Sequence, residues 1–315
     1  MPQRMHLTLA VLDANVAPMS VLLCIGLGYC ARHYTAAFGH RFQRIVGTSR
    51  GVKPQADGIE LFVFDGVRAD ESLRAAIAAC DHLLVSAAPG EAGDPVLGAL
   101  RTELSTAPLQ SIVYLSSLGV YGDHGGAWID ETAETVPAHG RGGARLAAER
   151  AWQAFGRERN VPVAVLRLAG IYGPGQNAFV RLLEGRAHRI SKPGHVFNRI
   201  HVADIAQAID AAFVRRFDGI VNVTDDWPAP PGDQIAFAAS LLGIDPPPEL
   251  SFAEAERTLS AFVMSFYRGC ARVRNDRLKR MLGVALQYPT YREGLVAILR
   301  SDDALRRAAA RGGAD

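Results

Sequence analysis

The sequence contains few cysteines, and their spacing excludes two kinds of structural support. Cys24, Cys30, Cys80 and Cys270 are the only four cysteines in 315 residues. None of them belongs to a Cys-x-x-Cys motif or lies beside paired histidines, so the sequence predicts neither a disulfide framework nor a metal site. Cysteines without such pairing are typical of the reducing cytoplasm, where we expect the protein to act.

The sequence also lacks an excess of charge and any long apolar run. Lys and Arg number 34 against 32 Asp and Glu, for a net charge of +2. No strong field therefore indicates nucleic acid or an anionic membrane as a partner. Every apolar run is shorter than the ~20 residues of a membrane-spanning helix. We expect a small-molecule substrate and no nucleic-acid or membrane partner, and we leave open a homodimer.

The first 18 residues make a poor signal peptide. Their apolar run, His6–Leu12, is followed at once by Asp13 and Asn15, which interrupt the hydrophobic region that such a signal needs. A strand pattern begins soon after Met19. We expect residues 1–18 to be an N-terminal appendage, with either Met1 or Met19 as the true start.

From Val21 onward, short β-branched runs alternate with Ala-rich helical stretches, which is the pattern of βαβ units. The predicted strands are Val21–Ile25, Arg44–Thr48, Leu61–Phe64, His82–Ser86, Ser111–Ser116 and Pro162–Leu168. The predicted helices are Ala31–Phe38, Glu71–Ala79, Pro95–Leu104 and Arg145–Arg159. Strands that are apolar without alternation indicate helices on both faces of the sheet. The sequence therefore predicts an α/β fold with a Rossmann-type doubly wound parallel sheet.

The composition changes after Tyr172, where loops rich in Gly and Pro become longer. We expect residues 19–170 to form a Rossmann domain. Residues 171–300 are expected to form a small C-terminal substrate-binding region that is intertwined with the Rossmann core. The remaining residues, 301–315, are expected to be a flexible tail.

A glycine motif follows the first predicted strand directly and opens the first helix. It reads Gly26, Leu27, Gly28, Tyr29, Cys30, Ala31, a G-x-G-x-x-A pattern in the setting that gives it meaning. In this pattern the first glycine makes the tight turn, the second lets the backbone approach a pyrophosphate, and the small residue allows close packing of the helix. Free N–H groups at the helix start would face the phosphates. Cys30 at that helix start would be a reactive thiolate or, as an alternative, a packing residue.

The end of the second strand favours NADP, with NAD left open. An NAD-selective site places an acidic residue ~20 positions past the glycines, whereas this chain has Thr48, Ser49 and Arg50, with Lys53 close behind. A hydroxyl pair and an arginine are suited to a 2′-phosphate. The alternative is that Arg50 is a solvated surface charge.

Two further segments are candidates for cofactor contact. Asp65 ends the third strand and would accept a hydrogen bond from the adenine amine. Ala87, Ala88 and Pro89 follow the fourth strand and would leave room for the ribose and pyrophosphate. Each of these segments has an ordinary loop role as its alternative.

At Tyr114–Gly122, followed by Asp130 and Glu131, the chain resembles the extended short-chain dehydrogenase/reductase superfamily, the relatives of nucleotide-sugar epimerases and dehydratases. Segments 166–175 and 199–204 agree with this resemblance, which spans roughly residues 20 to 300. More narrowly, segments 265–267, 272–275 and 288–295 resemble the atypical YeeZ-like subgroup. The resemblance implies a Rossmann fold and oxidoreductase or epimerase chemistry.

Members of that superfamily pair a catalytic Ser or Thr with a Tyr-x-x-x-Lys motif. By this resemblance Ser117 takes the serine role, because it lies four residues before Tyr121. The helix that follows preserves the spacing but has Arg141 at the tyrosine position and Arg145 at the lysine position. An arginine stays protonated and is no general base, although it binds anions and stabilises developing negative charge.

The proton carrier is therefore open. Tyr121 is the first candidate, with Asp123, His124 and Tyr172 as others, and each has a structural role as its alternative. The sugar-nucleotide contacts of the family are also missing, because Gly170 replaces its asparagine and Phe197 its phosphate-binding arginine. His201 and Asp204 are expected to fix a local turn. Several arginines either line an anionic pocket or lie in solvent: Arg167, Arg181, Arg186 and Arg189.

These observations favour an NAD(P)-binding oxidoreductase or epimerase-like enzyme that prefers NADP and acts on a small carbonyl or sugar-type substrate. Ser117 would bind the reacting oxygen, Tyr121 would carry the proton, and Arg141 and Arg145 would contact the cofactor ribose or a substrate anion. The alternative is a non-catalytic NADP(H)-binding sensor or regulatory module, which needs no proton carrier.

Overall fold

The computed structural model describes residues 19–52, 58–137 and 140–312. Within these residues a parallel sheet of seven strands has the order β11-β7-β5-β4-β1-β2-β3. The strands are β1 (Met19–Ile25), β2 (Phe42–Ser49), β3 (Ile59–Val63), β4 (His82–Val85), β5 (Ser111–Ser117), β7 (Val163–Leu168) and β11 (Gly219–Val223). The chain enters at β1, winds to one edge and then to the other, so the predicted doubly wound sheet is confirmed.

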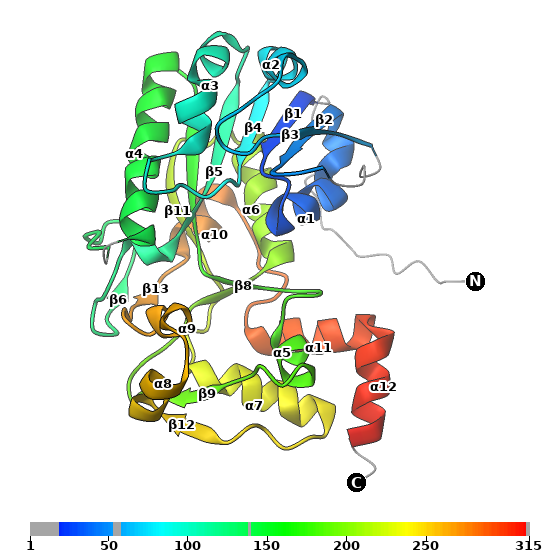
Figure 1. Cartoon of the computed structure of the whole chain (residues 1–315), viewed down its shortest axis with the longest axis vertical. Coiled ribbons are helices and arrows are strands. Elements are labelled where there is room, and N and C mark those ends of the chain that lie inside the picture. The colour runs from blue at the N-terminus through cyan, green and yellow to red at the C-terminus, as the bar shows by residue number, and fades with distance from the viewer. Residues whose placement is uncertain (1–18, 53–57, 138–139, 313–315) are drawn as a thin grey trace.

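Helices cover both faces of this sheet (Figure 1). One face carries α1 (Tyr29–Phe38), α6 (Val202–Val214) and α10 (Asp276–Leu282), and the other carries α2 (Glu71–Ala78), α3 (Pro95–Thr106) and α4 (Arg141–Arg159). Successive side chains of β1 lie on opposite faces of the sheet: Leu22 and Cys24 pack in the core on the first face, and Leu23 and Ile25 in the core on the second. This double burial explains why the strands read as unbroken apolar runs.

The elements predicted from the sequence are present, with two informative differences. Helix α4 begins at Arg141 rather than at Arg145, because packing overrides the low helix propensity of Gly142 and Gly143. No strand is predicted at β11, a short segment whose fourth residue, Asn222, is polar but completely buried. That polar residue is satisfied by hydrogen bonds, which the sequence pattern does not reveal.

The remaining elements lie mostly below the carboxyl ends of the strands (Figure 1). They include β8 (Gly170–Tyr172), α5 (Ala178–Leu183), β9 (Arg189–Ser191), β10 (Arg199–His201), α7 (Pro231–Leu242), β12 (Glu249–Ser251), α8 (Phe252–Thr258), α9 (Ala261–Ser265), α11 (Tyr291–Ser301) and α12 (Asp303–Gly312). Strands β10 and β8 form one parallel pair, and β12 and β9 form another. A further short pair joins β13 (Arg272–Val273) to β6 (Trp128–Ile129). Phe179, Leu242 and Leu295 belong to a separate apolar core in this lower region.

The chain passes repeatedly between the two regions. After β7 it builds β8 and α5, returns for α6 and β11, leaves again for α7 to α9, and returns for α10. Residue 170 is therefore no boundary in space, because α6, β11 and α10 complete the sheet half. The intertwining expected for residues 171–300 is this interleaving of segments.

The C-terminal segment differs from the expectation of a flexible tail. Residues 303–312 form α12, which packs against α7. Leu305 is buried in the lower core, and Asp302 caps the helix by accepting the N–H groups of Ala304 and Leu305. The prediction was wrong because an Ala-rich segment with an acidic cap and one apolar anchor is sufficient to form a docked helix.

Some of the predictions lie outside the described residues, namely the appendage at 1–18 and the position of Lys53. Among the helices that the structure does describe, none combines the length and the apolar character required to cross a membrane.

Candidate functional site

The glycine turn after β1 is built so that only glycine is accepted at its first position. Gly26 has φ of +90°, and a Cβ there would lie 3.0 Å from the backbone N of Ala87. The Gly26 N–H donates to Oγ1 of Thr48 at 2.9 Å, and the Leu27 N–H donates to the carbonyl of Thr48 at 2.7 Å. The turn thus packs between β2, to which its backbone hydrogen bonds, and the segment that follows β4.

The second glycine faces open space. A Cβ on Gly28 would have Gly26 O, at 3.9 Å, as its nearest neighbour. Gly28 is the N-cap of α1 and no side chain caps that helix, while Ala31 is completely buried against the sheet. The uncapped start of α1 and the unobstructed backbone at Gly28 together fit the pyrophosphate of a dinucleotide. The residues present therefore fit an NAD(P) cofactor.

Tyr29 and Cys30 begin α1 and serve the fold in different ways. The Tyr29 hydroxyl donates to the carbonyl of Pro174 at 2.9 Å, which connects the glycine turn to the loop after β8. Cys30 is buried, and burial raises the pKa of its thiol to about 11. The alternative of a reactive thiolate is therefore wrong, because desolvation outweighs the helix start.

The hydroxyls of Thr48 and Ser49, at the end of β2, hydrogen bond to the protein backbone and so are not available to a phosphate. Thr48 is buried and holds Gly26, and Ser49 donates to the carbonyl of Gly51 at 2.6 Å. This corrects the expectation that both hydroxyls serve a 2′-phosphate. Arg50 remains exposed at the strand end, where a guanidinium can meet such a phosphate.

The other cofactor candidates line the neighbouring strand ends. Asp65 is exposed, and its Oδ1 accepts the N–H groups of Val67 and Arg68. These backbone hydrogen bonds, led by the one from Arg68, lower the pKa of the Asp65 carboxyl. Ala87 is half-buried against Gly26, Ala88 is exposed and Pro89 is half-buried. All four lie at the carboxyl edge, beside the glycine turn.

Ser117 ends β5 and begins the 3₁₀ turn η2 (Leu118–Val120). Its Oγ accepts the N–H of Gly119 at 3.1 Å, which leaves its O–H free to donate. The side chain is half-buried. Ser117 thus lies at the carboxyl edge of the sheet, and its role in binding a reacting oxygen stays a prediction.

The start of α4 packs against the Ser117 turn at a glycine, Gly142. A Cβ on Gly142 would lie 2.8 Å from the carbonyl oxygen of Gly119, so glycine allows the start of α4 to pack against the loop of Ser117. Arg145 donates from Nη1 to the carbonyl of Leu115 at 2.6 Å. Arg141 instead points to α9, where its Nη2 donates to Oγ of Ser265 at 3.0 Å. The start of α4 thus packs against the Ser117 turn, while the Arg145 side chain binds β5 and the Arg141 side chain points to α9.

A buried polar cluster joins α4 to the sheet. Arg167 on β7 forms an ion pair with Glu149 on α4 at 2.8 Å, and Ser116 hydrogen bonds to the same carboxylate. Glu149 and Arg167 are 1% and 3% exposed. The expectation that Arg167 lines a pocket or lies in solvent is wrong, because its charge is neutralised inside the protein.

The four proton-carrier candidates are all engaged in structural contacts. Tyr121 is buried and its hydroxyl donates to Oδ1 of Asn222 at 2.8 Å, and burial raises its pKa. Tyr172 is also buried, with a pKa raised by burial, and donates to the carbonyl of Thr290. Asp123 accepts the N–H groups of Cys270 and Gly125, which lower its pKa. His124 hydrogen bonds to the carbonyl of Glu134, so each of the four makes a structural contact.

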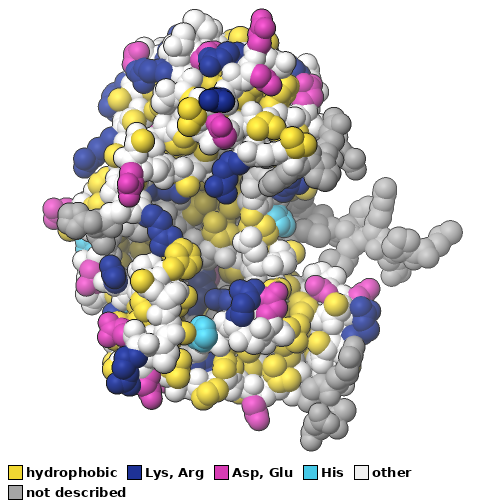
Figure 2. All heavy atoms as spheres, viewed as in Figure 1, with side chains coloured by type: hydrophobic (Ala, Val, Ile, Leu, Met, Phe, Trp, Pro, Cys, Tyr) yellow, Lys and Arg dark blue, Asp and Glu magenta, His cyan; other side chains and the backbone are white. Residues whose placement is uncertain are grey.

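Figure 2 shows the molecule hollowed between its upper and lower regions, with Lys and Arg side chains around the hollow.

The arginines considered from the sequence differ in their partners. Arg186 pairs with Glu184 and Arg189 with Glu249. Arg181 makes a different contact, because its Nη2 donates to the neutral Oε1 of Gln234. Burial lowers the pKa of Arg181.

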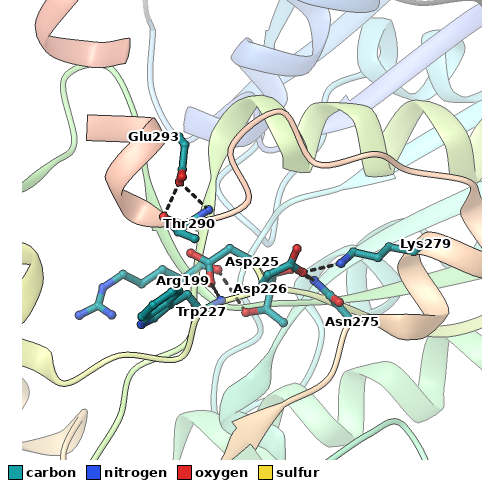
Figure 3. A network of polar contacts seen from close by, with 9 residues as sticks. Arg199, Asp225, Asp226, Trp227, Asn275, Lys279, Thr290 and Glu293 are labelled. Atoms are coloured by element: carbon teal, nitrogen blue, oxygen red, sulfur yellow. Dashed lines mark hydrogen bonds and ion pairs between the residues drawn. The ribbon is translucent and has the colours of Figure 1, made fainter. Parts of the chain in front are cut away.

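Segments of the lower region are held by a second polar cluster (Figure 3). The Arg199 guanidinium is directed away from Asp225 and donates to backbone carbonyls that include those of Phe197 and Ala229. Asp225 is buried and accepts the N–H of Trp227 with Oδ1, and its Oδ2 has no hydrogen-bond partner among the residues that the structure describes. Burial raises the pKa of Asp225 to about 8. This cluster escapes sequence analysis, since an Asp-Asp pair before a proline-rich loop resembles a solvated turn.

The expected turn role is confirmed for His201, whereas Asp204 also holds a segment that is distant in the sequence. Nδ1 of His201 accepts the N–H of Ala203 at 3.1 Å. Asp204 accepts the N–H groups of Gln287 and Tyr288 and is completely buried. These two side chains therefore fix the start of α6 and the chain that passes it.

Comparison with known proteins gives a family and several relatives. Residues 26–223 match the NAD dependent epimerase/dehydratase family. The 3-diazoavenalumate denitrifying reductase of a Streptomyces species is 34% identical over 140 residues, which are 42% of this chain and 45% of that protein. The chain thus matches less than half the length of this curated relative.

Two solved structures extend the comparison over almost the whole chain. A conserved protein of unknown function from Silicibacter pomeroyi is 44% identical with a TM-score of 0.80, covering 90% of this chain and 99% of that chain. Human epimerase family protein SDR39U1, solved with NADPH, is 19% identical with a TM-score of 0.70, covering 90% of this chain and 100% of that chain. The second likeness concerns the fold alone.

Proposed function

Because the chain belongs to the NAD dependent epimerase/dehydratase family, we propose that it is an NADP(H)-dependent reductase of a small carbonyl compound, in its atypical YeeZ-like subgroup. NAD(P) is the cofactor typical of this family, and the homologue from Streptomyces is a reductase. One observation carries the proposal: Gly142 packs against Gly119 in the turn of Ser117, so the start of α4, which carries the permanently cationic Arg141 and Arg145, lies against that turn.

The residues of the cleft have complementary roles in this proposal. NADPH held at the glycine turn would supply the hydride. Ser117 donates its free O–H to the carbonyl oxygen of the substrate, and Arg145 stabilises the negative charge that develops there. Solvent water supplies the proton that completes the alcohol, since an arginine does not release one. Arg50 selects the 2′-phosphate of NADP.

Reduction suits this cleft better than epimerisation of a nucleotide sugar. Epimerisation in this family begins with removal of a proton from an alcohol, and Arg141 stands where the tyrosine for that step is found. Gly170 and Phe197 replace the residues that the resemblance assigns to sugar-nucleotide contact. A carbonyl compound that only accepts hydride needs neither feature.

Steady oxidation of NADPH with a panel of aldehydes and ketones, followed at 340 nm, tests the proposal. We expect Ser117→Ala to reduce turnover by about 100-fold, as when a single oxyanion donor is lost. Ser240→Ala, on the exposed face of α7, is the matched control and should retain activity.

The non-catalytic sensor is the second candidate, and the engaged hydroxyl of Tyr121 favours it. It requires that NADPH bind at micromolar concentration without being consumed by any member of the panel. A partner protein would then bind with an affinity that depends on the cofactor. Turnover that depends on Ser117 would exclude this second candidate.

A further inference from the structure

Arg141 connects the two regions of the molecule through a cluster of four residues: Arg141, Phe262, Ser265 and Phe266. Its guanidinium carbon lies 4.7 Å from the ring centre of Phe262 and 5.8 Å from that of Phe266. The two rings meet edge to face at 5.3 Å. Since α4 belongs to the sheet half and α9 lies below its end (Figure 1), this Arg141 cluster bridges the cleft.

The charge of Arg141 is not neutralised within the described residues. Its polar contact there is the neutral hydroxyl of Ser265, whereas Arg167, Arg186 and Arg189 each pair with a glutamate. Arg141 also occupies the first turn of α4, which holds no acidic residue. A cation is disfavoured at the positive end of a helix dipole, so an anionic ligand would be stabilised there.

The two rings of the cluster are unusually exposed for their size. Phe262 is 58% and Phe266 54% exposed, although large apolar side chains are ordinarily buried. Rings that flank a guanidinium offer a surface on which a flat aromatic group can stack. The cluster therefore combines an anion-binding group with an aromatic-binding surface.

The cluster also lies beside the proposed reacting centre. Gly142 follows Arg141 and packs against the carbonyl of Gly119, and the N–H of Gly119 donates to Ser117. Arg141 is thus one residue away from a backbone contact with the Ser117 turn. This proximity makes the cluster a specificity element for the same cleft.

We infer that the substrate is an aromatic carboxylate that bears a reducible carbonyl. Its carboxylate replaces the Ser265 hydroxyl at Arg141, and its ring stacks on Phe262 and Phe266. The inference rests on the proposed function, because it names the substrate class of that reductase. Arg141 is then a specificity-determining residue rather than a proton carrier.

Calorimetric titration of the full chain, saturated with NADPH, tests the inference with three matched probes. They are 3-phenylpropionate, 3-phenylpropionamide and 3-cyclohexylpropionate, which separate the effect of charge from that of the aromatic ring. We expect 3-phenylpropionate to bind about tenfold tighter than either of the others, the difference between a charge-assisted and a neutral contact.

Substitutions assign the two effects. Arg141→Gln should bring the affinity for 3-phenylpropionate down to that for the amide. The double variant Phe262→Ala/Phe266→Ala should bring it down to that for the cyclohexyl acid. Arg292→Gln is the matched control, because Arg292 stacks at 4.8 Å on Phe237 away from this cluster, and it should leave all three affinities unchanged.

The outcomes separate this inference from the proposed function. If NADPH binds but the acid and its amide bind equally, the inference is overturned and the reductase proposal stands. If Arg141→Gln weakens NADPH and leaves the discrimination between probes intact, Arg141 serves the cofactor and the inference is again overturned. If NADPH does not bind, the same titration without cofactor decides: acid selectivity that depends on Arg141 supports the site, and its absence overturns both.

Discussion

Glu149 and Arg167 form a two-pronged ion pair in the interior, where Arg167 donates from Nε to Oε1 at 3.1 Å and from Nη2 to Oε2 at 2.8 Å. Glu149 lies on α4 and Arg167 on β7, so the pair fastens the helix to the sheet. The same carboxylate also hydrogen bonds to Ser116, next to Ser117. The positions of Arg141, Arg145 and Ser117 relative to one another therefore depend on this pair.

Glu149→Gln should destabilise the protein by about 3–5 kcal/mol, because it leaves the charge of Arg167 buried without a counterion. Urea unfolding at pH 7 measures this change. The exposed pair of Arg101 and Glu158 supplies the control, since Glu158→Gln should cost less than about 1 kcal/mol. Equal effects of the two variants would contradict the importance assigned to burial.

Gly28→Ala should leave the fold intact and weaken NADPH binding by about tenfold or more, because its Cβ would enter the space that the pyrophosphate requires. Gly26→Ala should impair both folding and binding, since its Cβ meets Ala87 and its φ is +90°. Thermal unfolding and NADPH titration of both variants separate the two effects. Unchanged affinity in Gly28→Ala would refute the placement of the pyrophosphate.

Arg50→Ala should weaken NADP binding by about 10- to 100-fold while NAD binding barely changes, because a charge-assisted contact to the 2′-phosphate is lost. Titration with both nucleotides measures the ratio. Arg68→Ala, which removes another exposed arginine near the edge of the sheet, is the control. A ratio that is the same in wild type and Arg50→Ala would show that Arg50 is a solvated charge.

Tyr121→Phe should cost about 1–2 kcal/mol of stability, because it leaves Oδ1 of Asn222 without its donor. Turnover should persist, in contrast to Ser117→Ala. The measurement compares kcat with the urea midpoint for each variant. Lost turnover at undiminished stability would instead make Tyr121 the proton carrier.

Asp225 should make the protein less stable as the pH rises from about 4 to 8. The unfolded carboxyl ionises near its ordinary pKa of about 3.9, whereas the folded one holds its proton to a pKa of about 8. The folded state then binds more protons across this interval, so its stability is lost with increasing pH. Asp225→Asn keeps an acceptor for Trp227 and should flatten the profile.

Melting temperatures at pH 5.0, 6.5 and 8.0 test this dependence. Glu158→Gln is the control, because Glu158 is exposed and paired with Arg101, and its profile should follow that of the wild type. A wild-type profile that does not fall toward pH 8 would contradict the protonated state of Asp225.

What could be predicted from the sequence was local. The glycine turn was recognisable because its geometry depends on six consecutive residues. The strands were recognisable because burial on both faces of the sheet makes each strand an unbroken apolar run. The contact between Arg141 and Ser265 was not, since it joins positions 124 residues apart. The pairing of Arg167 with Glu149 was missed for a different reason, because a buried arginine and a solvated one look alike in a sequence.

The interleaving of the sheet half with the lower region has a consequence for synthesis of the chain. Helix α6 covers much of one sheet face and packs on α1, but its last residue, Val214, is made long after β1 to β5. Strand β11 and helix α10 follow later still. A nascent chain therefore carries an uncovered apolar face on the ribosome until about two thirds of it has been translated, and this stage is where aggregation or chaperone capture would occur.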